Sequence, residues 1–172
     1  MNASTFANDF DDAHLAQLAL RVGGHLSAAG RRLVTAESCT GGWISKTVTD
    51  VAGSSAWFLG GAIVYSNELK QRMLGVDTSV LAQHGAVSEA AVRAMTAGAL
   101  ERLGGDLAIA VSGVAGPSGA TKDKPVGTIW LAWGRRGDVE TAIDTAHFLF
   151  SGDRELIRRQ TVFHALSRVL KL

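Results

Sequence analysis

The segment TAESCTGG, residues 35–42, combines side chains that can perform covalent chemistry with glycines that can shape a turn. Serine and cysteine are common nucleophiles of amide hydrolysis, and glycine lets backbone amides approach a ligand closely. The segment can therefore be a nucleophile on a tight turn, a phosphate-binding turn, or a polar connection between a strand and a helix. Three other polar segments have a similar composition: YSNELK at 65–70, SGVAGPSG at 112–119 and SGDR at 151–154.

None of these segments matches a common phosphate-binding or hydrolase fingerprint. GVAGPSG is neither the GxGxxG of dinucleotide-binding folds nor the P-loop pattern, and Ser38 does not lie in a GxSxG elbow. The five histidines have no metal-ligand spacing, so we expect no metal site and no cofactor. What remains is glycine, hydroxyl groups, and three cations that could hold negative charge: Lys70, Lys124 and Arg154.

Hydrophobic spacing predicts the elements that must position these residues. Helices are predicted at 12–28, from Thr40 onward, and at 67–74, 88–103 and 153–172, with caps at Asn67, Ser88 and Asp153. Strands are predicted at 31–36, 56–65, 106–113, 126–134 and 140–150, of which 56–65 is apolar enough to be buried. The last two strands flank the turn GRRGD, which favours a hairpin.

Strands that alternate with helices of this length predict an α/β fold, a three-layer α/β/α sandwich around a mostly parallel sheet. The C-terminal hairpin would make that sheet mixed. Ligands of such sheets bind outside the carboxyl ends of the strands. All four polar segments follow predicted strands, so we expect them to form a small-molecule site at one edge of the sheet.

Composition excludes several classes of protein. The 172 residues carry 17 Lys+Arg against 16 Asp+Glu, and this near-balance argues against a non-specific nucleic-acid binder. The single cysteine permits no intrachain disulfide, and no apolar run reaches the ~18 residues of a membrane span. The acidic N-terminal segment lacks the pattern of a signal peptide. We therefore expect one domain over residues 1–172, cytoplasmic and without a membrane partner.

Seven motifs in order resemble the C-terminal domain family of the competence-damage protein CinA. They are TAESCTGG, GSSAWFLGG, VYSNELKQRMLGV, GAVSEAA, SGVAGPSG, KPVGT and SGDRELIRRQT, and they span about residues 32–166. Members without the additional N-terminal domain of full-length CinA hydrolyse the carboxamide of nicotinamide mononucleotide. The resemblance thus implies an amidase of the pyridine-nucleotide cycle that forms nicotinate mononucleotide and ammonia. It also implies a homo-oligomer, whereas the expectation of no nucleic-acid partner rests on the charge balance.

The resemblance places the nucleophile at Ser38 and its general base at Lys70. Ser38 could instead be only the N-cap of the helix that follows it. Backbone amides of residues 39–42 would stabilise the oxyanion, and Cys39 is the rival nucleophile because a thiolate at a helix N-terminus is reactive. A lysine can act as a base only if burial or a nearby cation lowers its pKa, which the sequence does not show.

Tyr65 and Ser112 complete the expected catalytic set. Tyr65 would orient the amide or stack on the pyridine ring, and Ser112 would position Lys70 or the substrate. Glu37 either pairs within its turn or fixes Lys70.

The expected substrate contacts come from the same four segments. Arg154, in the first turn of the last helix, opposes the helix dipole and is better placed to bind the phosphate. The other expected contacts are Glu37, Thr40, Gly41, Gly42, Asn67, Gly113, Gly116 and Lys124. The alternative function is that of a non-catalytic nucleotide-binding protein linked to competence or DNA damage.

Overall fold

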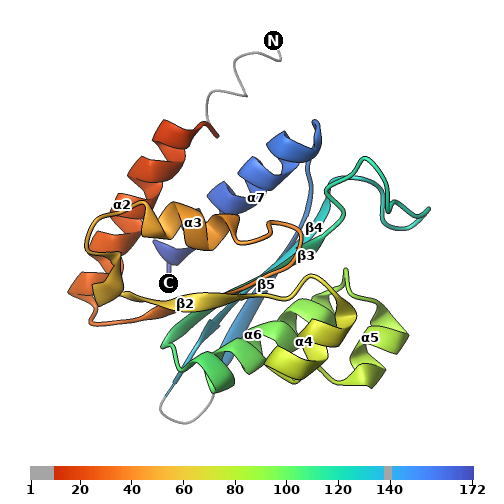
Figure 1. Cartoon of the computed structure of the whole chain (residues 1–172), viewed down its shortest axis with the longest axis horizontal. Coiled ribbons are helices and arrows are strands. Elements are labelled where there is room, and N and C mark those ends of the chain that lie inside the picture. The colour runs from red at the N-terminus through yellow and green to blue at the C-terminus, as the bar shows by residue number, and fades with distance from the viewer. Residues whose placement is uncertain (1–9, 138–140) are drawn as a thin grey trace.

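The structure, a computed structural model, describes residues 10–137 and 141–172 (Figure 1). Its helices are α2 (Asp12–Ala28), α3 (Trp43–Thr49), the short 3-10 helix η1 (Ser54–Ala56), α4 (Asn67–Leu74), α5 (Thr78–His84), α6 (Glu89–Leu103) and α7 (Arg154–Val169). Its strands are β1 (Leu33–Glu37), β2 (Phe58–Ile63), β3 (Leu107–Gly113), β4 (Thr128–Arg135) and β5 (Ala142–Leu149). All the predicted elements are present, and two helices among these residues, η1 and α5, were not predicted from the spacing.

The five strands form one mixed sheet in the order β2-β1-β3-β4-β5. Strand β1 runs parallel to both β2 and β3, whereas β4 runs antiparallel to β3 and to β5. The predicted hairpin is therefore confirmed as the β4/β5 pair, although Asp138 of its turn lies outside the described residues. This pattern brings the carboxyl ends of β1, β2, β3 and β5 to the same edge, as the four polar segments require.

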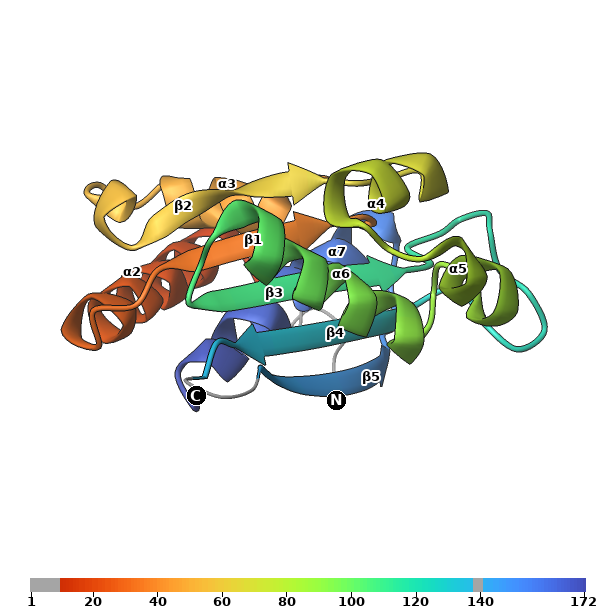
Figure 2. The same ribbon diagram turned by 90° about the horizontal axis from the view of Figure 1, so that it is seen from below.

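Two helical layers cover the sheet and confirm the α/β/α sandwich (Figures 1 and 2). Helices α2, α3 and α7 pack on one face, where Ile157 of α7 and Ile109 of β3 belong to one buried cluster. Helices α4, α5 and α6 pack on the other face, where Met95 of α6 and Ala110 of β3 belong to a second cluster. Because β3 is central, its side chains contribute alternately to both clusters.

Side-chain caps fix several helix starts close to the predicted residues. Ser88 accepts from the amide of Ala91 and Asp153 from that of Leu156, as expected. The cap of α4 was predicted one residue late, because Ser66 rather than Asn67 accepts from the Leu69 amide. Both residue types cap well, and composition alone does not separate two such neighbours.

The prediction that 56–65 is a buried strand was wrong. Strand β2 is the edge of the sheet, and Leu59 and Ile63 are 42% and 51% exposed. Gly61 of this strand reflects close packing against β1 rather than burial on both faces. A Cβ on Gly61 would lie 2.0 Å from Thr35 Oγ1, so only glycine lets β2 approach β1 at this point.

Candidate active site

The turn between β1 and α3 carries the expected nucleophile. Ser38 follows the last residue of β1, and its amide donates to the Val111 carbonyl of β3 at 3.2 Å. The Gly41 amide donates back to the Ser38 carbonyl at 3.0 Å, which removes Gly41 from the expected oxyanion donors. Gly41 and Gly42 have φ of 62° and 92°, a region that glycine adopts without strain. The two glycines thus let the chain turn sharply from the strand into the helix.

Glu37 fixes the start of α3 through hydrogen bonds to its buried carboxylate. Its carboxylate accepts from the Ile44 amide at 3.0 Å, the Ser45 amide at 2.8 Å and the Thr40 hydroxyl at 2.7 Å. Glu37 and Thr40 are both fully buried, so the expectation that their side chains contact the substrate is revised. Of the two roles left open for Glu37, pairing within the turn is the one seen.

Ser38 is not the N-cap of α3. That position belongs to Gly42, which makes no side-chain cap, and the carboxylate of Glu37 satisfies the free amides instead. The stabilising role that could have explained Ser38 is therefore absent. Its hydroxyl faces Lys70 instead.

Lys70 reaches Ser38 from α4, on the opposite layer of the sandwich. Its Nζ lies 3.2 Å from Ser38 Oγ and donates to the carbonyls of Val64 at 2.9 Å and Tyr65 at 3.0 Å. Lys70 is only 1% exposed, and among the described residues no carboxylate lies within ion-pair distance of it. Burial therefore lowers the pKa of the Lys70 amine, since the charged form loses its hydration.

The environment of Cys39 is unsuited to a thiolate. The residue is 6% exposed, and burial raises the pKa of the Cys39 thiol to about 12. A thiol with such a pKa is almost entirely protonated near neutral pH and reacts slowly. The two candidate nucleophiles therefore differ. The Ser38 hydroxyl lies beside an amine of lowered pKa, whereas the Cys39 thiol has a raised pKa.

A cavity of about 290 Å³ opens beside the turn, between the loops that follow β1, β2 and β3 and the start of α7. Its lining residues are Cys39, Tyr65, Val87, Gly113, Val114, Ala115, Gly116, Ser118, Gly119 and Arg154. Tyr65 is 62% exposed here, and Arg154 is anchored by a 2.6 Å bond from Nη1 to the Gly116 carbonyl. The structure thus brings four of the expected site residues to one cavity: Tyr65, Gly113, Gly116 and Arg154.

The remaining expected residues lie in different surroundings. Ser112 is buried and follows Val111, the β3 partner of Glu37, so it is adjacent to Ser38 across the sheet. Asn67 is exposed on the first turn of α4. Lys124 is not among the residues that line the cavity, because its Nζ donates to the His84 carbonyl at the end of α5.

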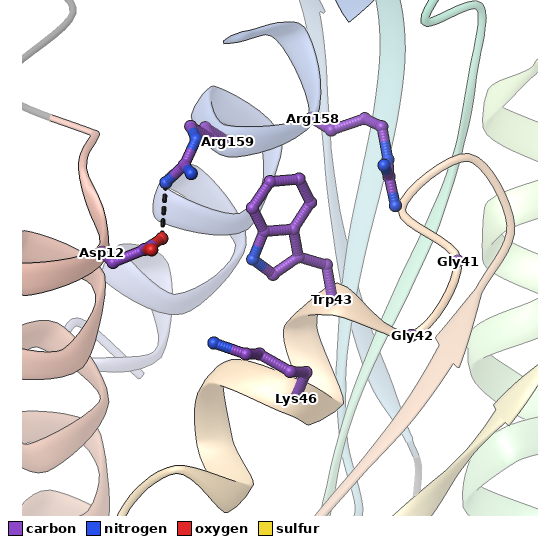
Figure 3. A pocket seen from close by; sticks show the side chains of 7 residues that line it. All are labelled: Asp12, Gly41, Gly42, Trp43, Lys46, Arg158 and Arg159. Atoms are coloured by element: carbon purple, nitrogen blue, oxygen red, sulfur yellow. Dashed lines mark hydrogen bonds and ion pairs between the residues drawn. The ribbon is translucent and has the colours of Figure 1, made fainter. Parts of the chain in front are cut away.

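Sequence reasoning missed a second cavity of about 330 Å³ on the other side of the turn (Figure 3). Its lining residues are Asp12, Gly41, Gly42, Trp43, Lys46, Arg158 and Arg159. The Trp43 ring has the guanidinium of Arg158 at 4.9 Å and that of Arg159 at 5.0 Å from its centre. The available signal was the spacing of Arg154 and Arg158, which puts both on one face of α7.

In the described ranges, 10–137 and 141–172, no cluster of three His, Cys, Asp or Glu side chains could hold a metal ion. Within the same part of the chain, no helix has the length and apolarity that a membrane crossing requires.

Comparison with known proteins places the chain among CinA-related sequences. The family described as the CinA C-terminal domain matches residues 15–172. The nicotinamide-nucleotide amidohydrolase PncC of Escherichia coli K12 is 51% identical over 156 residues, 90% of this chain and 92% of that protein. The corresponding Pseudomonas putida protein is 50% identical over 90% of this chain and 94% of its own. A CinA-like protein of Akkermansia muciniphila is 50% identical, but the match covers 34% of its length.

Solved structures agree with this relationship. The competence damage-inducible protein A of Klebsiella pneumoniae superposes with a TM-score of 0.87 at 40% identity and covers 91% of this chain and 95% of its own. The competence/damage-inducible protein of Agrobacterium tumefaciens gives 0.88 at 38% identity, with 94% and 97% coverage. The family resemblance of the seven motifs is therefore confirmed at the level of both sequence and fold.

Proposed function

The chain belongs to the CinA C-terminal domain family, and from this premise we propose that it hydrolyses the carboxamide of nicotinamide mononucleotide to nicotinate mononucleotide and ammonia. Relatives with about half of their residues identical are nicotinamide-nucleotide amidohydrolases. The observation that carries the mechanism is the 3.2 Å contact between Lys70 Nζ and Ser38 Oγ. The proposal includes a single domain over residues 1–172, acting in the cytoplasm in pyridine-nucleotide recycling.

Lys70 is proposed to act as the general base in its neutral form. A neutral amine has two N–H donors and one lone pair. The carbonyls of Val64 and Tyr65 accept the two N–H bonds, which leaves the lone pair directed at the hydroxyl of Ser38. The lowered pKa makes the neutral form accessible nearer to neutral pH than in an exposed lysine.

The reaction then proceeds through an acyl-enzyme. Ser38 Oγ attacks the carboxamide carbon while its proton passes to Lys70 Nζ. Lys70 returns that proton to the amide nitrogen, the C–N bond breaks, and ammonia leaves. A water molecule, deprotonated by the same amine, attacks the ester and releases the carboxylate and the Ser38 hydroxyl. Backbone amides of the turn stabilise the negative oxygen formed in both steps.

Substrate specificity is proposed to come from the cavity beside Cys39. Arg154 would bind the phosphate, because its guanidinium lines the cavity and no carboxylate of the described residues pairs with it. The exposed ring of Tyr65 would stack on the pyridine. Gly113 and Gly116 also line the cavity, and their backbone would contact the ribose. Ser112 is proposed to assist Lys70 from the adjacent strand.

Ammonia release from nicotinamide mononucleotide by the purified protein tests the proposal. We expect turnover that is lost in Ser38→Ala and retained in Cys39→Ala. Parallel assays on nicotinamide and its riboside should show much weaker activity if the phosphate is bound. Loss in Cys39→Ala alone would point to thiol chemistry instead. Saturable binding without ammonia would favour the non-catalytic nucleotide-binding function.

The homo-oligomer implied by the family resemblance is also kept as a proposal. Edge strand β2 and its neighbourhood expose large apolar side chains: Leu59, Ile63, Tyr65 and Met73. Such side chains are common where copies of a chain associate. Analytical ultracentrifugation of the wild type and of Ile63→Lys tests this, since a monomeric wild type would contradict it.

A further inference from the structure

Arg158 reaches from α7 to the turn that carries Ser38. Its Nη2 donates to the Thr40 carbonyl at 2.6 Å, and its guanidinium lies against the Trp43 ring (Figure 3). Of the buried side-chain nitrogen and oxygen atoms in the described residues, Arg158 Nε alone lacks a hydrogen-bond partner. An unsatisfied buried donor costs about 1–3 kcal/mol, so the position of Arg158 is not explained by stability alone.

The other cations of this cavity are already neutralised. Lys46 pairs with Asp50 at 2.7 Å, and Arg159 pairs with Asp12 at 2.6 Å and Glu155 at 2.9 Å. In contrast, no carboxylate of the described residues lies within ion-pair distance of Arg158. The cavity as a whole therefore has little excess charge to hold a free anion. The positive charge of Arg158 is directed at the turn instead.

A chain of hydrogen bonds connects Arg158 to the peptide that follows the proposed nucleophile. The peptide between Thr40 and Gly41 accepts from Arg158 through its carbonyl and donates to the Ser38 carbonyl through its N–H, at 3.0 Å. A cationic donor polarises that peptide and strengthens its N–H as a donor. The Thr40 carbonyl also accepts from the Trp43 amide at 3.2 Å, so it is fixed from two sides.

The orientation of the Cys39 amide follows from this chain. The only cis peptide among the described residues is Gly116-Pro117, so the peptide between Ser38 and Cys39 is trans. In a trans peptide the carbonyl and the N–H point in opposite directions. Because the Ser38 carbonyl points into the turn toward Gly41, the Cys39 N–H points out of it. Cys39 lines the substrate cavity, where that N–H can meet a developing oxyanion.

We propose that Arg158 is a positioning residue of the amidase that holds the Cys39 amide in place for the oxyanion through the carbonyls of Thr40 and Ser38. This inference rests on the proposed function, because it assigns Arg158 to the turn of the same nucleophile. It predicts an effect on the rate of the chemical step and not on the binding of the substrate phosphate, which is assigned to Arg154.

Steady-state kinetics of Arg158→Ala test the proposal. We expect kcat to fall about 10- to 100-fold with KM changed less than about twofold, below the about 10²–10³-fold cost of deleting an oxyanion donor itself. The fold-loss should be the same on the mononucleotide and on the riboside, and Arg158→Lys should recover part of it. Arg159→Ala is the matched control, since Arg159 also lies over Trp43 but directs its hydrogen bonds to Glu155, Phe10 and Asp12 and not to the turn.

Two outcomes would overturn the inference. A rise in KM confined to the phosphorylated substrate would make Arg158 a phosphate ligand. Equal losses in Arg158→Ala and Arg159→Ala would make it a packing residue. Hydrogen–deuterium exchange gives an answer independent of turnover: exchange in the peptide that covers the turn should rise in Arg158→Ala and stay unchanged in Arg159→Ala. A wild type without amidase activity would remove the proposed function, and the exchange result would still decide whether Arg158 holds the turn.

Discussion

The turn from Ser38 to Gly42 lies between two regions that shift the pKa of a lysine in opposite directions. On one side, burial lowers the pKa of Lys70, which has two backbone carbonyls and a hydroxyl as its partners. On the other side, a hydrogen bond to Asp50 raises the pKa of the Lys46 amine, which is well exposed. The two sides of the turn therefore carry one lysine with a lowered pKa, Lys70, and one with a raised pKa, Lys46.

The difference shows how one short segment supports both chemistry and structure. Two backbone carbonyls accept the N–H groups of Lys70, and the Ser38 hydroxyl lies beside the amine. None of these partners supplies the negative charge that would keep the amine protonated. Carboxylate partners around Lys46 and Arg159 do supply that charge, and those side chains link α3 and α7 to neighbouring acidic groups. The proposed mechanism therefore assigns proton transfer to the Lys70 side of the turn, and the proposed role of Arg158 assigns support of the turn to the Trp43 side.

Replacing Lys70 by methionine should produce the largest effect. Lys70→Met keeps the length of the side chain but removes the proposed base, so we expect amidase activity to fall about 10²–10⁴-fold. Lys46→Met, on the opposite side of the turn, is the matched control and should retain nearly full activity. Initial rates of ammonia release from nicotinamide mononucleotide measure both. Similar losses in the two variants would remove the contrast between the two lysines.

The pH dependence of stability should give a smaller but directional effect. In the unfolded chain Lys70 has its ordinary pKa near 10.5, whereas burial lowers that pKa in the folded protein. Between the two pKa values the unfolded state binds more protons, so the free energy of unfolding rises with pH, by at most about 1.4 kcal/mol per unit. Below the folded pKa both states are protonated and this dependence disappears.

Urea unfolding of the wild type and of Lys70→Met at several pH values between 7 and 10 isolates this contribution. The free energy of unfolding of the wild type minus that of the variant should increase with pH, because all other groups cancel in the difference. Parallel pH curves for the two proteins would mean that the pKa of Lys70 is the same in the folded and unfolded states.

The sequence predicted the layers and the edge of the sheet that holds the cavity. Regular spacing of apolar residues and strong caps such as Ser88 and Asp153 make these elements local properties of the chain. The place of β2 at the edge of the sheet could not be predicted from its own residues. An apolar strand at the edge of a sheet and one at its centre can have the same composition. The strand order decides between them, because β2 pairs only with β1 among the described strands.

The site was predictable in part for the same reason. Segments that follow parallel strands meet at one edge, so Tyr65, Gly113 and Arg154 were expected together and line one cavity. The depth of a side chain depends on packing across the whole fold. The sequence could not show that Glu37 is fully buried, that Lys124 bonds to the end of α5, or that Arg158 crosses from α7 to the turn.

Disrupting the ion pair between Lys46 and Asp50 should give the smallest of these effects on stability and none on activity. This outcome would show that the Trp43 side of the turn has a structural role only. The two side chains are four residues apart on and just after α3, and they are 58% and 45% exposed. Exposed pairs at this spacing contribute about 0.3–0.5 kcal/mol, and salt screens them. A double-mutant cycle with Lys46→Ala and Asp50→Ala should give a coupling of that size that decreases in 1 M salt, with amidase activity unchanged. A coupling several times larger, or a loss of activity, would mean that this side of the turn also takes part in the chemistry.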